Sequence, residues 1–407
     1  MSQIQVLPNR RVPRPFVAAG LFLLARLALA VEPLPPAAAT AGAPLASQVI
    51  SLDGEGWLLA TDPANVGRDE QWWNAPRPDA KTTKVPWIIQ EPFPGYHGVA
   101  WYWRDFSAAA NPFPQGRTLL RFWAVDYTAE VWLNGVRAGS HEGGESPFVL
   151  DVTDAIRAGA PNRLAVRVLN PTHEPIDGIV LAQTPHRNKA LPYSAGSAWN
   201  QGGIMDSVEL LVVPPVYLED VFVRPDWKTG RVRIQAGVRN TNQNAVPMQL
   251  ELSIAPAQAG ETLAVCSVPQ TVPAGASQID AELQVAQPRW WELNDPYLYR
   301  VTARLRAVDS AAFDEQSVRC GFRDFRVENG AFRLNGRRIY LRCSHTGNCC
   351  PIGLELPPDP DFLRRDLLNA KVMGFNAIRF IAGVAKRYQL DLCDEIGLMV
   401  YEEAYAS

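Results

Sequence analysis

Residues 361–381 read Asp-Phe-Leu-Arg-Arg-Asp-Leu-Leu-Asn-Ala-Lys-Val-Met-Gly-Phe-Asn-Ala-Ile-Arg-Phe-Ile, and this stretch decides the fold of the C-terminal part of the chain. Apolar residues recur at helical spacing over residues 361–373, and Gly374 follows, where a helix commonly ends in the left-handed conformation. Residues 376–381 then form a short apolar run that is typical of a buried strand. A helix that leads at once into a buried strand predicts a parallel α/β fold.

The same alternation continues on both sides of this stretch. Residues 339–342 predict the strand before the helix, residues 388–396 predict a second short helix, and residues 398–401 predict a third strand. We therefore expect residues 322–407 to form the start of a (β/α)8 TIM barrel, with its first three strands. A complete barrel of this kind takes about 250 residues, so we expect the barrel to be incomplete in this chain.

Residues 47–215 have the pattern of a β-sandwich. Apolar and polar residues alternate over residues 117–123, 129–133 and 163–168, and Asn134-Gly135 follows the second run as a tight hairpin turn would. Many short strands separated by turn residues predict a jelly-roll domain, and its tryptophans suit sugar rings as well as core packing.

A second β-sandwich is predicted after Pro214-Pro215. Residues 216–321 contain short alternating runs at regular spacing. A length of about 100 residues and this spacing are typical of an immunoglobulin-like sandwich. The three regions together predict a multidomain protein that is largely β and ends in an α/β part.

The N-terminal end carries the features of an export signal. Three arginines precede the apolar residues 16–25, and small residues follow around Ala30. We expect residues 1–30 to be a signal peptide that is removed on export to the periplasm or the extracellular medium, and residues 31–46, rich in Pro and Ala, to be a linker. A spanning helix needs about 20 apolar residues, so we expect no membrane association after cleavage.

The composition excludes nucleic acid as a partner and gives little support to a metal site. The chain has 407 residues and a formal net charge of −3, so it offers no basic field. Cys343, Cys349 and Cys350 are close to His345 in sequence, but no paired CxxC spacing supports metal binding, and we predict no cofactor. Cys349 and Cys350 either pair with Cys343 or Cys320 after export or stay buried as small apolar residues.

Several short motifs occur along the chain in the order in which they occur in one enzyme family. They include Trp-Tyr-Trp-Arg at 101–104, Val-Trp-Leu-Asn-Gly at 131–135, Gly-Gly-Ile-Met at 202–205, Asn-Asp-Pro-Tyr-Leu-Tyr at 294–299 and Gly-Phe-Asn-Ala-Ile-Arg at 374–379. On these residues the chain resembles glycoside hydrolase family 2, the family of β-galactosidases, β-glucuronidases and β-mannosidases.

The resemblance implies a β-galactosidase-like hydrolase of O-glycosidic bonds in β-glycosides, with a retaining mechanism. Such an enzyme needs a carboxylic acid and a nucleophilic carboxylate about 5–5.5 Å apart. In the family these two glutamates follow barrel strands four and seven, and neither position occurs in this chain. Glu402 and Glu403 do not replace them, because neighbours on a strand point to opposite faces. We therefore expect this chain alone to hydrolyse no glycoside.

Five residues are candidates for substrate binding. Arg379 lies near the end of the second predicted strand, and the resemblance implies that it supports the nucleophile. His345 and Asn348 are expected in the loop after strand one, where the resemblance implies contact with sugar hydroxyls. Glu403 follows strand three, where it either hydrogen-bonds a sugar, pairs with Arg379 or is solvated. Asp126 matches a position from which the jelly roll of some family members reaches the site.

Two other classes of function stay open. A non-catalytic carbohydrate-binding or accessory protein would use the two sandwiches alone, and sugar binding by residues 47–321 in isolation would favour that reading. Alternatively, the chain is one half of a split enzyme and associates with a separately encoded remainder of the barrel, or it forms a homo-oligomer. In each case the expected partner is a carbohydrate.

Overall fold

The structure is a computed structural model of the whole chain. It describes residues 45–185, 189–192, 198–308, 310–346, 361–381 and 383–403. The predicted signal peptide and almost all of the predicted linker lie outside these residues.

The first β-sandwich packs two antiparallel sheets face to face. One sheet, in the order β3-β2-β4-β10-β7-β8, consists of β2 (Gly54–Asp62), β3 (Lys81–Val85), β4 (Gly98–Ser107), β7 (Thr128–Leu133), β8 (Val136–Glu142) and β10 (Pro161–Asn170). The other, in the order β1-β14-β5-β9, consists of β1 (Gln48–Ser51), β5 (Arg117–Phe122), β9 (Phe148–Asp151) and β14 (Val208–Val213). Side chains from both sheets, such as Tyr102 and Leu120, form the core between them.

Short elements complete this sandwich. They are η1 (Trp72–Asn74), β6 (Val125–Asp126), η2 (Leu181–Gln183), β11 (Lys189–Ala190), β12 (Ala198–Trp199) and β13 (Gly203–Ile204). The predicted turn at Asn134-Gly135 is confirmed: it joins β7 to β8, with φ of 53° and 84° at its two residues. Positive φ at both central positions is what a two-residue hairpin turn requires.

A second apolar cluster covers the outer face of the six-stranded sheet. Trp101 and Trp103 of β4 point to this face and are buried beneath Trp72 of η1. Trp132 of β7 packs against Trp101, with the ring centroids 5.2 Å apart. Strand β4 is therefore buried on both faces over its first six residues, a pattern that period-two alternation does not predict.

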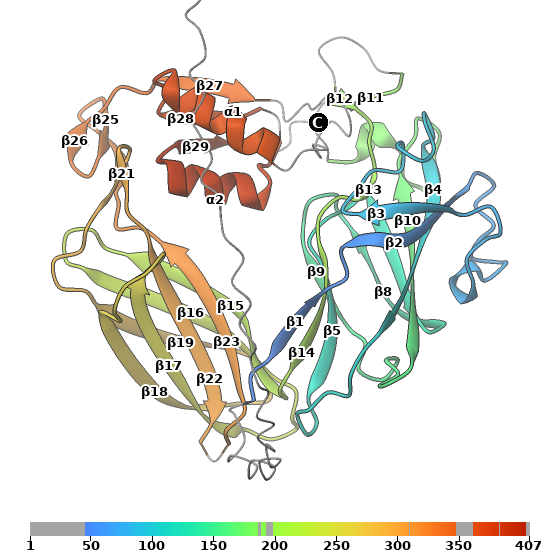
Figure 1. Cartoon of the computed structure of the whole chain (residues 1–407), viewed down its shortest axis with the longest axis horizontal. Coiled ribbons are helices and arrows are strands. Elements are labelled where there is room, and N and C mark those ends of the chain that lie inside the picture. The colour runs from blue at the N-terminus through green and yellow to red at the C-terminus, as the bar shows by residue number, and fades with distance from the viewer. Residues whose placement is uncertain are drawn as a thin grey trace, which may run out of the picture. The chain divides into compact units, whose positions relative to one another are not determined.

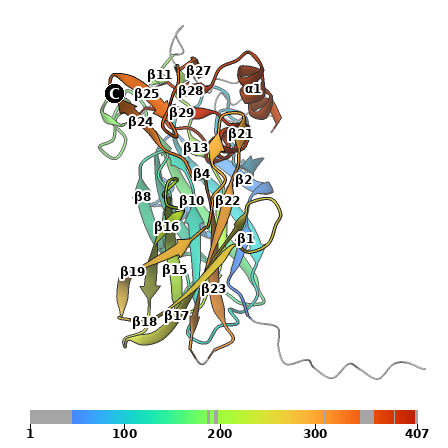
Figure 2. The ribbon, with the colours of Figure 1, turned by 90° about the vertical axis from the view of Figure 1, so that its left-hand side faces the viewer.

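The second β-sandwich follows directly. Its three-stranded sheet, in the order β15-β16-β19, consists of β15 (Val216–Pro225), β16 (Arg231–Asn240) and β19 (Gly275–Gln284). Its four-stranded sheet, in the order β18-β17-β22-β23, consists of β17 (Val246–Pro256), β18 (Ala264–Val272), β22 (Tyr299–Ala307) and β23 (Phe313–Cys320). One apolar core fills the space between them. Figure 2 shows β22 and β23 running side by side, as their antiparallel register requires.

The remaining elements begin with short hairpins and end in an α/β segment. The hairpin strands are β20 (Trp291–Glu292), β21 (Asp295–Pro296), β24 (Phe325–Glu328), β25 (Ala331–Leu334) and β26 (Arg337–Arg338). The α/β segment consists of β27 (Cys343–Thr346), α1 (Asp361–Val372), β28 (Ala377–Phe380), α2 (Arg387–Ile396) and β29 (Met399–Glu402). Its three strands are parallel, in the order β27-β28-β29, and the two helices lie beside them in Figure 1.

The local signals of the α/β segment are confirmed. Ile378 and Phe380 of β28 pack on Leu367 of α1, which gives the segment its own small core. Gly374 and Gly397 follow the two helices with φ of 88° and 82°. A side chain at Gly397 would also place its Cβ 2.2 Å from the carbonyl oxygen of Leu293, so both conformation and space require glycine there.

One predicted strand is wrong. Residues 339–342 are not a strand, and the strand that pairs with β28 is β27, which begins at Cys343. The Asn376 side chain accepts a hydrogen bond from the Arg342 amide (2.9 Å) and donates one to the Tyr340 carbonyl (2.9 Å). Together with single backbone bonds from Ile339 to Phe332 and from Asn376 to Arg342, these bonds hold the stretch without a regular ladder. The apolar alternation of residues 339–342 resembled a strand, but tertiary pairing selected the more polar residues after it.

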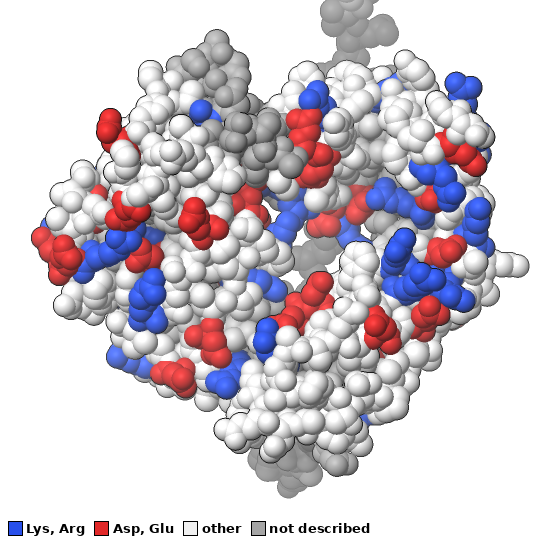
Figure 3. Space-filling view, turned by 180° about the vertical axis from the view of Figure 1, so that it is seen from behind, with Lys and Arg blue, Asp and Glu red and all other residues white. Residues whose placement is uncertain are grey.

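The fold is thus mostly β, with two sandwiches that agree with the jelly-roll and immunoglobulin-like predictions and a three-stranded parallel α/β segment. No helix in the described part of the chain has the length and apolar character needed to cross a membrane. Figure 3 shows Lys and Arg intermingled with Asp and Glu on one face, which fits the small net charge.

Candidate functional site

Three side chains share one face at the carboxyl ends of the parallel strands. The ladder pairs Arg379 of β28 with His345 of β27 on one side and with Tyr401 of β29 on the other. Paired residues of parallel strands point to the same face, so His345, Arg379 and Tyr401 form a row across the segment. Ligand sites of parallel α/β folds assemble at this end of the strands.

Arg379 and Glu403 form an ion pair in this row. The Arg379 Nε donates to Glu403 Oε1, and the guanidinium carbon lies 5.6 Å from the centroid of the Tyr401 ring. The hydrogen bond to Glu403 raises the pKa of Arg379 above its usual value. Pairing with Arg379 is thus the observed state of Glu403, while sugar contact by either residue stays a prediction.

Glu402 and Glu403 serve different parts of the segment. Glu402 Oε1 accepts a hydrogen bond from the Ala385 amide at 2.5 Å and so holds the loop that leads into α2. Glu403 instead binds Arg379 on the row described above. The two carboxylates therefore do not converge on one point, as expected for neighbours on a strand.

His345 lies in a different element from the one predicted. The sequence placed it in the loop after strand one, but it belongs to β27 and is exposed. Its change of element follows from the shift of that strand to Cys343, and it brings the imidazole into the row with Arg379. Asn348, the other residue predicted in that loop, lies outside the described residues.

Asp126 lies in the first sandwich, on β6, and is paired with a lysine. The Lys189 ammonium donates to Asp126 Oδ2 and to the Gln201 carbonyl oxygen, the latter at 3.1 Å. Asp126 is only 7% exposed, and Gly144 packs close to its carboxyl carbon. The described hydrogen bond and ladder pairing of Asp126 lie within the first sandwich, so its reach into a site shared with the row on β27 to β29 remains a prediction.

Beside Asp126 the first sandwich buries a network of amide side chains that the sequence did not reveal. Asn170 is fully buried, accepts from Gln90 Nε2 at 3.0 Å and donates to Asn200 Oδ1 at 3.0 Å. The His97 Nδ1 lies 2.9 Å from Asn170 Oδ1, and burial lowers the pKa of His97. These residues come from separate parts of the chain and form no motif, so only the fold brings them together.

A contact between α2 and the first sandwich was also missed. The Arg387 guanidinium donates two hydrogen bonds to Asp206, at 3.1 and 2.8 Å, and lies 3.6 Å from the centroid of the Trp123 ring. Arg387 is the first residue of α2 and follows the loop held by Glu402. This contact fixes the start of α2, eight residues after Arg379 in the chain.

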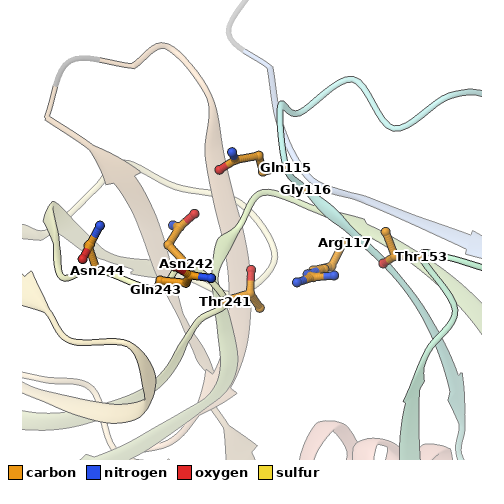
Figure 4. A pocket seen from close by; sticks show the side chains of 8 residues that line it. All are labelled: Gln115, Gly116, Arg117, Thr153, Thr241, Asn242, Gln243 and Asn244. Atoms are coloured by element: carbon orange, nitrogen blue, oxygen red, sulfur yellow. The ribbon is translucent and has the colours of Figure 1, made fainter.

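One cavity lies next to the α/β segment, and another lies at residues outside it. One, of about 810 Å³, lies against β29 and is lined by apolar and aromatic residues, with Arg323 and Asp394 as charged members. Burial raises the pKa of Asp394. The other, of about 490 Å³, is lined only by amide, hydroxyl and glycine residues and by Arg117; Figure 4 shows Thr241 and Asn242 on one side of it and Arg117 and Thr153 on the other. It contains none of the predicted site residues.

Comparison with known families identifies the chain. The model for the sugar binding domain of glycosyl hydrolases family 2 matches residues 49–214, and a second model, glycosyl hydrolases family 2, matches residues 216–323. Together they account for well over half of the sequence. The chain belongs to glycosyl hydrolase family 2.

Solved structures agree on the fold of this family 2 chain. A family 2 member from Bacteroides cellulosilyticus is 24% identical with a TM-score of 0.70, and the match covers 88% of this chain and 47% of that one. A β-glucuronidase from Ruminococcus gnavus in complex with D-glucuronic acid is 23% identical, with a TM-score of 0.72 and coverage of 88% and 60%. The β-glucuronidase 2 of Bacteroides uniformis is 23% identical with a TM-score of 0.72, and the match covers 88% of this chain and 42% of that one.

These structures extend the fold comparison to most of this family 2 chain, but the match spans less than two thirds of each structure's own length.

The described part of the chain contains four cysteines, and all four are free thiols: Cys266, Cys320, Cys343 and Cys393. Within the described residues, no group of three or more His, Cys, Asp or Glu side chains is arranged to hold a metal ion.

Proposed function

We propose that this chain supplies the sugar-binding part of a family 2 hydrolase that cleaves O-glycosidic bonds of β-glycosides. The observation that carries the proposal is the row of His345, Arg379 and Tyr401, with the Arg379–Glu403 pair, at the carboxyl ends of three parallel strands. The family match supports glycoside chemistry. The proposed substrate is a β-galactoside or a β-glucuronide. The β-glucuronide is included because the similar Ruminococcus gnavus protein is a β-glucuronidase.

Arg379 has the role of a donor in this proposal. A guanidinium carries five N–H groups in a planar fork, so it can hold Glu403 and still donate to a further oxygen. That oxygen belongs to the nucleophilic carboxylate or to the sugar. His345 and Glu403 flank it and provide polar groups for sugar hydroxyls, while Tyr401 offers a ring face.

The retaining reaction needs an acid and a nucleophile, and the row of His345, Arg379 and Tyr401 contains neither. Its acid and nucleophile must stand about 5–5.5 Å apart across the sugar. Glu402 and Glu403 do not form this pair, because their carboxylates bind groups in different parts of the segment and do not converge on one point. We therefore propose that these 407 residues alone bind a glycoside weakly and do not hydrolyse it.

Further parts of the proposal concern organisation and location. Residues 47–215 and 216–321 are proposed as jelly-roll and immunoglobulin-like domains, and residues 322–407 as the first three strands of a (β/α)8 barrel. The α/β segment supports this because β27, β28 and β29 are parallel and consecutive. The N-terminal pattern supports export to the periplasm or beyond. We propose that the chain also associates with a second polypeptide or with a second copy of itself.

The test uses the purified 407-residue chain with nitrophenyl β-galactoside, β-glucuronide and β-mannoside. We expect no release of nitrophenol, and we expect calorimetry to detect weak binding of the preferred monosaccharide, D-galactose or D-glucuronic acid. Arg379→Ala should weaken that binding at least fivefold. Arg300→Ala is the matched control, because Arg300 is an exposed arginine of the second sandwich.

Each result has a definite reading. Turnover of any of the three glycosides would contradict the proposed inactivity. Equal binding by the wild type and Arg379→Ala would remove Arg379 from the site. Binding that survives in residues 47–321 alone would instead favour the non-catalytic carbohydrate-binding function.

A further inference from the structure

A separate cavity lies on the first sandwich, away from the row of Arg379. It has a volume of about 350 Å³, within the usual range for small-molecule sites. Its lining combines the aromatic ring of Trp73 with charged groups and amides, which include Asp105, Asn134, Arg157, Asn162 and Arg163. None of these residues belongs to β27, β28 or β29.

The aromatic wall of this cavity is held in a fixed orientation. The Trp73 ring stacks on Trp132, with centroids 5.1 Å apart and an angle of 8° between the planes. Trp132 is itself only 5% exposed and belongs to β7. Trp73 is partly exposed, so the packed cluster beneath it presents a rigid indole to the cavity. Such a ring packs well against the C–H face of a sugar at low entropic cost.

The polar wall is built on one buried asparagine. Asn162 is 1% exposed, accepts from the Arg157 amide at 2.7 Å and donates to the Arg157 carbonyl at 2.9 Å. Asn134 Nδ2 donates to Asn162 Oδ1 at 2.8 Å, and Asn134 Oδ1 accepts from the Arg163 amide at 3.0 Å. The backbone at Arg157 is therefore clamped in place while its side chain is exposed.

The charges of the cavity do not balance. Arg163 makes a bidentate pair with Asp105, at 2.8 and 2.7 Å, and also donates to the Asn74 carbonyl at 3.2 Å. Arg157 has no ion-pair partner among the described residues, so the cavity that Trp73 also lines keeps one uncompensated guanidinium. A planar guanidinium matches the two oxygens of a carboxylate.

We propose that this cavity is a surface binding site for a uronate, a sugar that carries a carboxylate, with Trp73 against the sugar ring and Arg157 on the acid group. This site is distinct from the row of Arg379 and does not rest on the proposed hydrolase function. It would anchor the chain on acidic polysaccharide.

The test measures binding of trigalacturonate to the full chain by calorimetry, with a neutral galactose trisaccharide and sodium sulfate as comparison probes. Arg157→Gln should weaken trigalacturonate binding at least tenfold and should leave the circular dichroism spectrum unchanged. Arg137→Gln, which removes an exposed arginine of β8 outside the cavity, should leave binding within twofold of the wild type. Trp73→Phe keeps an aromatic ring and should abolish most of the tryptophan fluorescence change on binding.

Three outcomes would overturn the proposal. The first is unchanged trigalacturonate binding in Arg157→Gln, and the second is equal affinity for the neutral trisaccharide or for sulfate. The third is loss of trigalacturonate binding in Arg379→Ala, which would place the ligand at the row instead. Retained binding in Arg379→Ala supports the surface site even where the glycosidase proposal fails.

Discussion

The two β-sandwiches differ in whether the outer face of a sheet is covered. In the second sandwich, β16 buries Val232, Ile234, Ala236 and Val238 and turns the residues between them outward. In the first, β4 is buried at six consecutive residues, because the cluster around Trp101 covers the face that would otherwise meet water. A strand shows a period of two only where one of its faces is solvated.

The ion pairs of the two sandwiches also differ in burial. On the outer face of the first sandwich, Arg167 is 1% exposed and pairs with Asp177 at 2.6 Å and with Glu130 at 3.3 Å. In the second sandwich, the pair of Arg304 and Glu315 lies on the surface, with both side chains more than a third exposed. Burial, more than the number of ion pairs, decides which of them matters for stability.

The largest expected effect tests whether the outer cluster is a true core. Trp101→Ala should lower the free energy of unfolding by about 4 kcal/mol, because it removes a fully buried aromatic side chain and leaves a cavity. Denaturant unfolding followed by circular dichroism, together with hydrogen exchange of the β10 amides, measures the loss. Val265→Ala on the second sandwich is the control: Val265 is 75% exposed, and the change should cost less than about 0.5 kcal/mol. A cost below about 1 kcal/mol for Trp101→Ala would show that the outer face is only loosely covered.

A somewhat smaller effect is expected for the buried arginine. Arg167→Ala should cost about 3 kcal/mol, because Glu130 and Asp177 lose a buried partner and keep Arg68 as their ion-pair partner. Arg304→Ala, measured in the same way, should cost no more than about 1 kcal/mol. Equal costs for the two variants would contradict the distinction between buried and surface pairs.

The smallest effect concerns Asp314, the buried carboxylate of the second sandwich. It is 3% exposed, accepts hydrogen bonds from the Ser47 hydroxyl and the Leu218 amide, and burial raises its pKa above the ordinary value of 3.8. The Asp314 carboxyl group therefore binds its proton more tightly in the folded state than in the unfolded state. The resulting stability is full below pH 3.8 and is lost as the pH rises through the raised pKa.

Asp314→Asn should remove that pH dependence. Thermal unfolding between pH 4 and pH 7 should show the wild type losing stability relative to the variant as the pH rises. Asp280→Asn, at an exposed position of β19, serves as the control and should follow the wild-type profile. A constant difference between wild type and Asp314→Asn across this range would show that Asp314 is ionised equally in both states.

Local signals predicted much of the fold. Asn134-Gly135 needs two left-handed residues, Gly374 and Gly397 end helices, and the apolar run around Ile378 forms a buried strand; each depends on a few neighbouring residues. The strand at Cys343 could not be predicted in this way. Its residues are less apolar than those before it, and pairing with β28 selected them.

The candidate site was predicted in part. The sequence indicates Arg379 because it lies near the end of the second predicted strand and Glu403 because it follows the third, and the structure joins them. The pairing of Asp126 with Lys189 and the contact of Arg387 with Asp206 were not predicted, since their partners are 63 and 181 residues apart in sequence. No spacing rule connects residues at such separations.

The sequence by itself determined the kinds of elements in this chain, their order and the family to which it belongs, because turn residues, periodicity and short motifs act over a few positions. Only the tertiary structure decided which strand pairs with β28, which face of β4 is covered, and that Arg157 lines a cavity without an ion-pair partner among the described residues. Those outcomes depend on burial and on electrostatic contacts between distant segments. Such contacts exist only once the chain has folded.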